Sequence, residues 1–188
     1  MTDYSQDIRK CLYAPEDGGI GDFCIIEAGD GWHLFYLYRE FHRDGLDIHP
    51  AASRGIDRYI GHAVSPDLIN WTTHRPILEI LPDSKLENLM LWAPSVVKHE
   101  GIHNMFYTGV DVNRRQSICL ARSRDLYRWD RPIDRPVFDS GDTSWAPWSF
   151  ADSRECRDPW VMKHGDGYLM YYTAVSYTHL TLPTILLV

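Results

Sequence analysis

The chain has 188 residues, of which 44% are hydrophobic and 24% charged, and its formal net charge is −7. This composition is typical of a folded globular protein and excludes an intrinsically disordered chain. The acidic balance argues against a nucleic-acid-binding surface, which needs a basic stripe, and the absence of an 18-residue apolar run argues against a membrane span.

The N-terminal residues 1–10 are polar and lack the apolar core of a signal peptide. The four cysteines are Cys11, Cys24, Cys119 and Cys156, and none belongs to a Cys-x-x-Cys pair. A zinc site is therefore not expected, and neither is another metal or cofactor. Unpaired cysteines favour reduced, mostly buried thiols in a cytoplasmic protein.

Three segments of the chain resemble one another: residues 21–36, 92–108 and 157–173. Each consists of a short apolar run, a charged turn with glycine, and an aromatic run, which is the pattern of a β-hairpin. The aromatic runs contain Tyr36, Tyr107 and Tyr172, which are 71 and 65 residues apart.

A second element recurs between the hairpins, at residues 60–71 and 118–129. Both copies predict a strand followed by the motif Ser-x-Asp-Leu-x-x-Trp. Serine and aspartate favour a tight turn because their side chains bond the backbone, and the tryptophan is expected to pack behind that turn as a structural residue. A fourth strand is expected at residues 75–80 and again at 136–138.

Four strands per unit, at a period near 65 residues, predict an all-β fold and favour a β-propeller over a sandwich or a solenoid. The expected blades are about 20–80, 91–138 and 157–174, each a four-stranded antiparallel sheet, within one domain of residues 1–174. The third blade stops early, so we expect about two and a half blades.

The segment 175–188 does not follow the repeat. It has no charged residue and no glycine, and it lacks the Ser-x-Asp-Leu-x-x-Trp motif that is due at this point. We expect it to be a non-native tail, similar to a translated sequencing-adapter scar. The alternative is a native closing strand, because Thr, Leu, Ile and Val favour strands.

The openings of the three hairpins carry the candidate catalytic residues. The innermost strand of a propeller blade lines the central channel, so the repeat is expected to bring Asp22, Ala93 and Asp158 to equivalent places around one axis. Glycosidic chemistry needs two carboxyl groups, and clustered carboxylates raise one another's pKa. The alternatives are a turn residue for Asp22 and a cap before proline for Asp158. The charged insertion at residues 39–58 is a candidate cover for the channel mouth.

Asp22, the triplet Trp92-Ala93-Pro94 and the triplet Arg157-Asp158-Pro159 resemble the openings of the first three blades in the five-bladed β-propeller glycosidases of glycoside hydrolase families 32 and 43. Family 32 usually opens with Asn-Asp-Pro-Asn-Gly, whereas Gly21-Asp22-Phe23 lacks both the Asn before the aspartate and the Pro after it. The resemblance leaves the choice between the two families open.

This resemblance implies a role for each matching residue. Asp22 would be the nucleophile of a retaining enzyme or the base of an inverting one. Asp158 would bind sugar hydroxyls and stabilise the oxocarbenium-like transition state. Arg157 would bond the same sugar and keep Asp158 ionised. Trp92 would form an aromatic wall of the cleft, with ordinary hairpin packing as the alternative.

The resemblance also implies a function, namely a hydrolase that acts on a carbohydrate substrate such as a fructoside or an arabinoside. Its general acid would be a glutamate of a fourth blade, so we expect the chain to be an inactive N-terminal fragment. Glu155 is expected to be a loop residue and not this acid. The alternatives are a non-catalytic sugar-binding propeller and a related phosphorylase. The phosphorylase would need a basic phosphate pocket, and only Arg157 is expected near the site. The sequence leaves the oligomeric state open.

Overall fold

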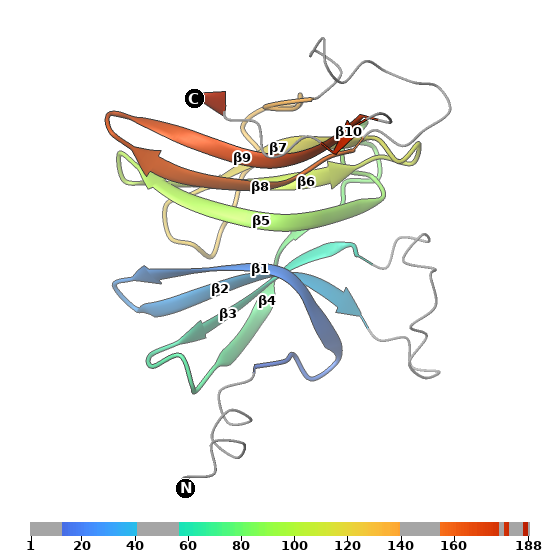
Figure 1. Cartoon of the computed structure of the whole chain (residues 1–188). Coiled ribbons are helices and arrows are strands. Elements are labelled where there is room, and N and C mark those ends of the chain that lie inside the picture. The colour runs from blue at the N-terminus through green and yellow to red at the C-terminus, as the bar shows by residue number, and fades with distance from the viewer. Residues whose placement is uncertain (1–12, 41–56, 140–154, 177–178, 181–185, 188) are drawn as a thin grey trace, which may run out of the picture.

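The computed structural model describes residues 13–40, 57–139, 155–176, 179–180 and 186–187, which form antiparallel strands and turns without a helix (Figure 1). The first sheet has the strand order β1-β2-β3-β4. Its strands are β1 (Gly18–Ala28), β2 (Gly31–Glu40), β3 (Tyr59–Ser65) and β4 (Thr72–Glu79). Since the described part of the chain has no helix, it has none that could cross a membrane.

The second sheet contains β5 (Met90–His99), β6 (Ile102–Val110) and β7 (Gln116–Ser123), in that order. Two isolated bridges, from Ile118 to Phe138 and from Arg122 to Asp130, continue the sheet beyond β7. The first bridge lies where the sequence predicts the fourth strand, so the second unit repeats the up-and-down order of the first.

The third sheet pairs β8 (Glu155–His164) with β9 (Gly167–Ser176). The short strands β10 (His179–Leu180) and β11 (Leu186–Leu187) pair antiparallel with β9. Both come from the segment predicted to be non-native, whose origin stays a prediction. Glu155 was expected in a loop, but its backbone forms the first pair of β8, with Val175. That expectation was wrong because the strand begins before the Arg-Asp-Pro triplet.

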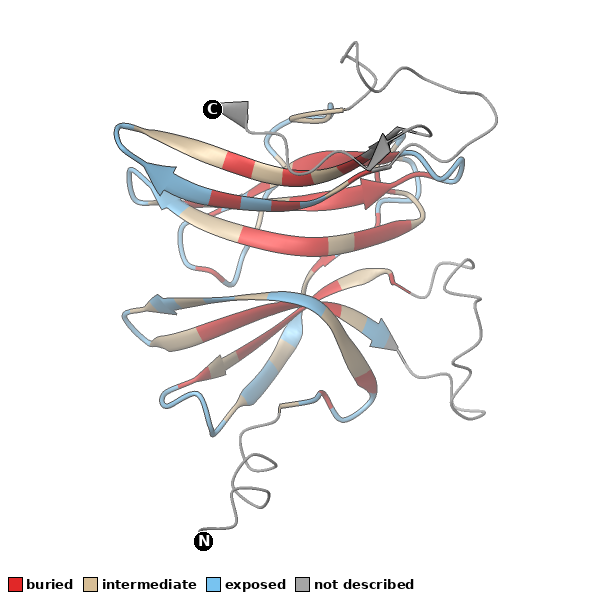
Figure 2. Ribbon diagram, in the orientation of Figure 1, coloured by how far each residue is buried: buried red, intermediate tan, exposed pale blue. Residues whose placement is uncertain are grey.

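The core lies between successive sheets. The inner strand β5 packs against both β1 and β8, so the three inner strands lie next to one another. One apolar cluster, with Phe35, Leu91 and Tyr107, joins the first two sheets. A second cluster, with Ile118 and Met170, joins the second and third. Figure 2 shows the buried residues concentrated in the strands and the exposed residues at the hairpin turns.

The two Ser-x-Asp-Leu-x-x-Trp motifs form the turns that the sequence predicts. In the second copy, Asp125 Oδ1 accepts the backbone N–H groups of Tyr127 and Arg128 at 2.9 and 2.8 Å. Leu126 has a left-handed φ of 68°, and its carbonyl accepts the indole N–H of Trp129 at 3.0 Å. The first copy repeats these contacts with Asp67, Leu68 and Trp71. The tryptophans are therefore structural, as expected.

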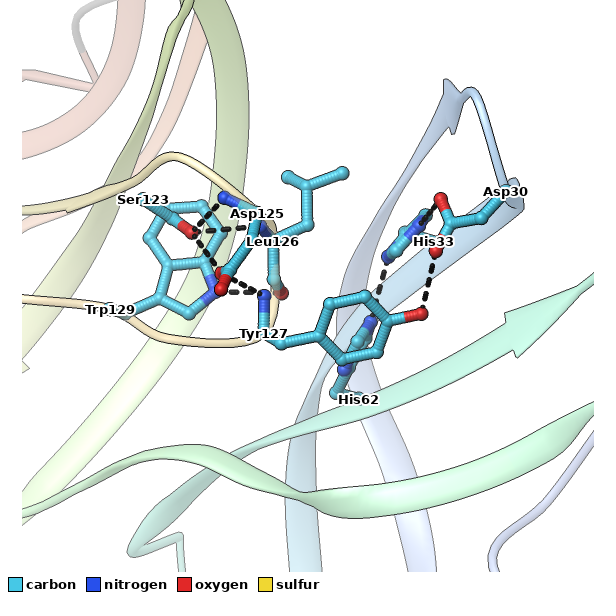
Figure 3. A network of polar contacts seen from close by, with 8 residues as sticks. All are labelled: Asp30, His33, His62, Ser123, Asp125, Leu126, Tyr127 and Trp129. Atoms are coloured by element: carbon cyan, nitrogen blue, oxygen red, sulfur yellow. Dashed lines mark hydrogen bonds and ion pairs between the residues drawn. The ribbon is translucent and has the colours of Figure 1, made fainter.

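The second of these turns is bound to the first sheet by a polar network (Figure 3). The hydroxyl of Tyr127 donates to Asp30 Oδ2 at 2.7 Å, and Asp30 Oδ1 accepts from His33 Nε2 at 2.9 Å. His33 Nδ1 lies 2.9 Å from His62 Nε2. The bond from Tyr127 to Asp30 thus links the second unit to a histidine pair of the first sheet.

Candidate active site

Each of the three inner strands contains a β-bulge, in which two residues face one residue of the neighbouring strand. The bulge residues are Gly21-Asp22 in β1, Ala93-Pro94 in β5 and Asp158-Pro159 in β8. A proline is tolerated at a bulge because it has no N–H to lose from the ladder. Bulges commonly redirect side chains beside active sites.

The strand pairing corrects the predicted equivalence of Asp22, Ala93 and Asp158 by one residue. Gly21, Ala93 and Asp158 share the first bulge position, whereas Asp22 shares the second with the prolines of the other two bulges. Matching carboxylates suggest one register for the repeat, but backbone pairing sets another. The two carboxylates are therefore presented from different positions of the same kind of bulge.

All four predicted site residues nevertheless line one cavity of about 490 Å³. Asp22 comes from β1, Trp92 from β5, and Arg157 and Asp158 from β8. Asp22 and Asp158 also line an adjoining cavity of about 380 Å³ along the three inner strands. The two carboxylates thus lie where the two cavities meet, on strands from two different sheets.

Asp158 is held in a strained backbone conformation. Its φ is 56°, in the left-handed region that a residue with a side chain seldom adopts. Its backbone N–H donates to the buried Thr108 Oγ1 at 3.0 Å, and the N–H of Val161 donates to Ser95 Oγ at 3.1 Å. These two bonds from the second sheet fix the bulge of the third. Ala93, at the same bulge position of β5, also has a left-handed φ, of 46°, so this conformation belongs to the bulge.

The electrostatic surroundings of Asp158 differ from the expectation for it. Arg157 Nε lies 3.3 Å from Asp158 Oδ2, and its charge acts to lower the pKa of that carboxyl group. Burial is the larger effect, and together with the charge of Asp22 it raises the pKa of Asp158 above its ordinary value. Arg157 therefore opposes protonation of Asp158 without outweighing burial.

Two further polar residues, which the sequence did not single out, also line the cavity. Arg114 lies in the turn between β6 and β7, and Gln116 begins β7. Gln116 Oε1 accepts a long hydrogen bond from Arg157 Nη1 at 3.5 Å. No motif marks either residue, because their approach to the site depends on how the second sheet packs against the third. The cavity is completed by Met90 and Val110.

The remaining expectations concern the charged insertion, a metal site and the cysteines. Residues 41–56 of the charged insertion lie outside it, so its predicted position over the channel mouth stays a prediction. Within the described ranges, no group of three or more His, Cys, Asp or Glu residues is arranged to hold a metal ion. Cys24, Cys119 and Cys156 are free thiols. Burial raises the pKa of Cys24 to about 12, so this half-buried thiol forms little thiolate at neutral pH.

The successive antiparallel sheets, with two carboxylates on their inner strands, are the arrangement expected of a β-propeller glycosidase fold. The family model described as "Glycosyl hydrolases family 32 N-terminal domain" matches residues 23–186. The chain therefore belongs to glycoside hydrolase family 32. Asp22 lies one residue before the matched segment.

The chain is similar in sequence to several enzymes. It is 36% identical over 117 residues to a 1,2-β-oligomannan phosphorylase of a Thermoanaerobacter species, covering 57% of this chain and 36% of that one. It is 32% identical over 114 residues to an insoluble β-fructofuranosidase isoenzyme of Arabidopsis thaliana, covering 56% and 19%. The chain thus spans only about a fifth to a third of the length of these relatives.

Solved structures confirm the predicted fold class. A family 32 β-fructofuranosidase of Bombyx mori has a TM-score of 0.65 and 18% identity, with 94% of this chain and 35% of that chain covered. A fructan 1-exohydrolase of Cichorium intybus has a TM-score of 0.65 and 22% identity, covering 88% and 29%. A family 43 β-xylosidase/α-arabinofuranosidase from a compost metagenome has a TM-score of 0.59 and 16% identity, covering 84% and 43%.

Proposed function

We propose that the protein containing this chain hydrolyses furanosides, with fructosides as the first substrates to test. One observation carries the proposal: Asp22 and Asp158, from two different sheets, line one cavity together with Arg157 and Trp92. Paired carboxylates are what hydrolysis of a glycosidic bond requires. Among the relatives, the names β-fructofuranosidase and probable sucrose-6-phosphate hydrolase support a fructoside.

The proposed roles follow the positions of the side chains. Asp22 attacks the anomeric carbon or activates water, Asp158 binds sugar hydroxyls and stabilises the positive charge of the transition state, and Trp92 is the aromatic wall. Arg157 donates to the sugar and to Asp158. Because the pKa of Asp158 is raised, the acidic limb of the activity profile is expected at a higher pH than an unperturbed aspartate would give.

The reaction also needs a group that protonates the leaving oxygen. The described residues that line the cavity include no glutamate, and we propose that this acid lies outside residues 1–188. We further propose that residues 1–174 are the propeller part of the chain and that residues 175–188 are not native. Turnover of a furanoside by residues 1–188 alone would refute this assignment of the acid. The cytoplasmic location stays a prediction.

The test is an assay of the complete gene product on sucrose, sucrose 6-phosphate and an aryl α-L-arabinofuranoside, with and without inorganic phosphate. Release of free fructose at a rate independent of phosphate is the expected result. Hydrolysis of the arabinofuranoside alone would keep the reaction class and change the sugar. Binding of these sugars without turnover of any of them would identify a non-catalytic propeller.

A phosphorylase is the second candidate, and Arg114 favours it. The cavity holds two arginines, Arg114 and Arg157, where the sequence indicated only one. Paired guanidinium groups suit a phosphate dianion, and a relative is named as a 1,2-β-oligomannan phosphorylase. Strict dependence on phosphate, with a sugar 1-phosphate as the product, would replace hydrolysis by phosphorolysis at the same site.

A further inference from the structure

The carboxylate of Asp57 lies buried between the first sheet and the wall of the cavity. Its side chain is 3% exposed. Oδ1 accepts a hydrogen bond from Arg39 Nε at 2.9 Å, and Oδ2 accepts one from the indole N–H of Trp92 at 3.1 Å. Both carboxylate oxygens are therefore engaged, each by a different element of the molecule.

Arg39 connects this contact to the candidate nucleophile. It stands near the end of β2, beyond the residues that face the bulge of β1. The hydrogen bond that Arg39 donates to Asp57 is the largest influence that raises the pKa of Arg39, and the charge of Asp22 adds to it. The direct partner of Arg39 is therefore Asp57, and Asp22 acts on it only through its charge.

A buried carboxylate is costly unless it is paired and hydrogen-bonded, so a role as simple filler does not explain Asp57. The carboxylate is not needed to attach β5 to the first sheet either, because the backbone of Asp57 already makes that connection. The carbonyl oxygen of Asp57 accepts the N–H of Leu91 at 2.9 Å. The carboxylate instead bonds the side chain of Trp92, which lines the cavity, and that of Arg39.

We propose that Asp57 is a positioning residue of the candidate active site. It holds the Trp92 indole in place along the cavity wall, and its pairing with Arg39 keeps the carboxylate charged and in position. This inference rests on the proposed function, because it takes Trp92 as a site residue. Asparagine can accept a bond on one atom only, so Asp57→Asn keeps the shape and the backbone bond but loses one of the two side-chain contacts and the charge.

The first experiment tests the geometry without any activity. The complete gene product is labelled with ¹⁵N, and the indole N–H signals of its tryptophans are compared between wild type, Asp57→Asn and Trp92→Phe. The signal that disappears in Trp92→Phe belongs to Trp92, and we expect Asp57→Asn to shift it. Asp83→Asn, in the exposed loop after β4, should leave it in place. An unmoved Trp92 signal in Asp57→Asn would overturn the proposal.

The second experiment tests the consequence for catalysis. A hydrogen bond to a charged group contributes about 1.5–3 kcal/mol, so Asp57→Asn should raise KM about 10-fold, with kcat changed much less. In the background of Trp92→Phe the same substitution should raise KM by less than about 2-fold, because the indole contact is already gone. Equal effects in both backgrounds, or a loss of kcat at unchanged KM, would contradict the positioning role. If wild type turns over no substrate, the proposed function fails while the indole signal still decides the geometry.

Discussion

At the scale of the residue, the histidine pair between the first two sheets shows how burial selects a protonation state. Asp30 is an acceptor, so His33 Nε2 must carry the proton of their 2.9 Å bond. When His33 is neutral, its Nδ1 accepts from His62 Nε2. This leaves His62 Nδ1 as a bare lone pair, in agreement with its lack of a hydrogen-bond partner among the described residues. Burial and the neighbouring histidines lower the pKa of His62 to about 3.

This titration predicts a loss of stability in acid. His62 has an ordinary pKa of 6.5 and a folded pKa of about 3. At a pH between these two values, His62 is protonated in the unfolded chain and neutral in the folded protein. The free energy of unfolding should therefore fall as the pH drops from 6.5 towards 3, by up to about 1.4 kcal/mol per pH unit. His62→Gln keeps a donor for His33 and should flatten this slope in urea unfolding at several pH values. The exposed substitution His164→Gln should not, and an unchanged slope in His62→Gln would refute the account.

At the scale of the element, local signals predicted the hairpins and the Ser-x-Asp-Leu-x-x-Trp turns because their causes are local: glycine at turns and side chains that bond the nearby backbone. The register of the inner strands was not predictable to the residue. A bulge inserts one residue without changing the hydrophobic pattern on either side, so Asp22 and Asp158 seemed equivalent but occupy different bulge positions.

Gly61 of β3 has no side chain, and this allows the ring of Tyr36 in β2 to pack directly against its backbone. A Cβ placed on Gly61 would overlap the ring of Tyr36, which is 1% exposed. Gly61→Ala should therefore destabilise the protein by about 1–3 kcal/mol through overpacking. Gly29→Ala is the matched control, since nothing lies within 4 Å of the added carbon. Urea unfolding of both variants is the measurement, and equal stabilities would show that the first sheet adapts freely at this point.

At the scale of the whole molecule, a buried ion pair joins the first two sheets. Arg131 Nε lies 2.8 Å from Glu87 Oε1, and Tyr107 donates to Glu87 Oε2 at 2.8 Å. Arg131 Nη2 also donates to the carbonyl of Glu79 in β4 at 2.6 Å. Burial raises the pKa of Glu87, and the Arg131 charge opposes this. The carboxylate of Glu87, in the segment after β4, thus binds Tyr107 of β6 and Arg131 of the loop after β7.

Breaking this pair on one side should be costly. Arg131→Leu leaves Glu87 buried without its counter-charge, and we expect a loss of about 3–5 kcal/mol in the free energy of unfolding. The double variant Arg131→Leu with Glu87→Gln should recover part of this loss, because the uncompensated charge is gone. Arg135→Leu, at an exposed arginine, is the control. A single variant within about 1 kcal/mol of wild type would contradict the expected cost of an unpaired buried charge.

The candidate site was partly predictable at this largest scale. Motifs predict Asp22, Trp92, Arg157 and Asp158, which lie together in the structure. No motif marks Arg114 or Asp57, although Asp57 lies in the charged insertion at residues 39–58. Their positions depend on the packing between sheets, which brings a turn of the second sheet to the cavity and buries a residue of the first against Trp92.

The central claim is that Asp22 and Asp158 act in one glycosidic site, and the turnover of their asparagine variants tests it most directly. In the complete gene product, Asp22→Asn and Asp158→Asn should each lower kcat on the best substrate by about 10²–10⁴-fold, since each keeps its shape and loses the charge. The matched control is Asp166→Asn, in the exposed turn between β8 and β9, which should retain activity. Wild-type turnover in both site variants would contradict the account.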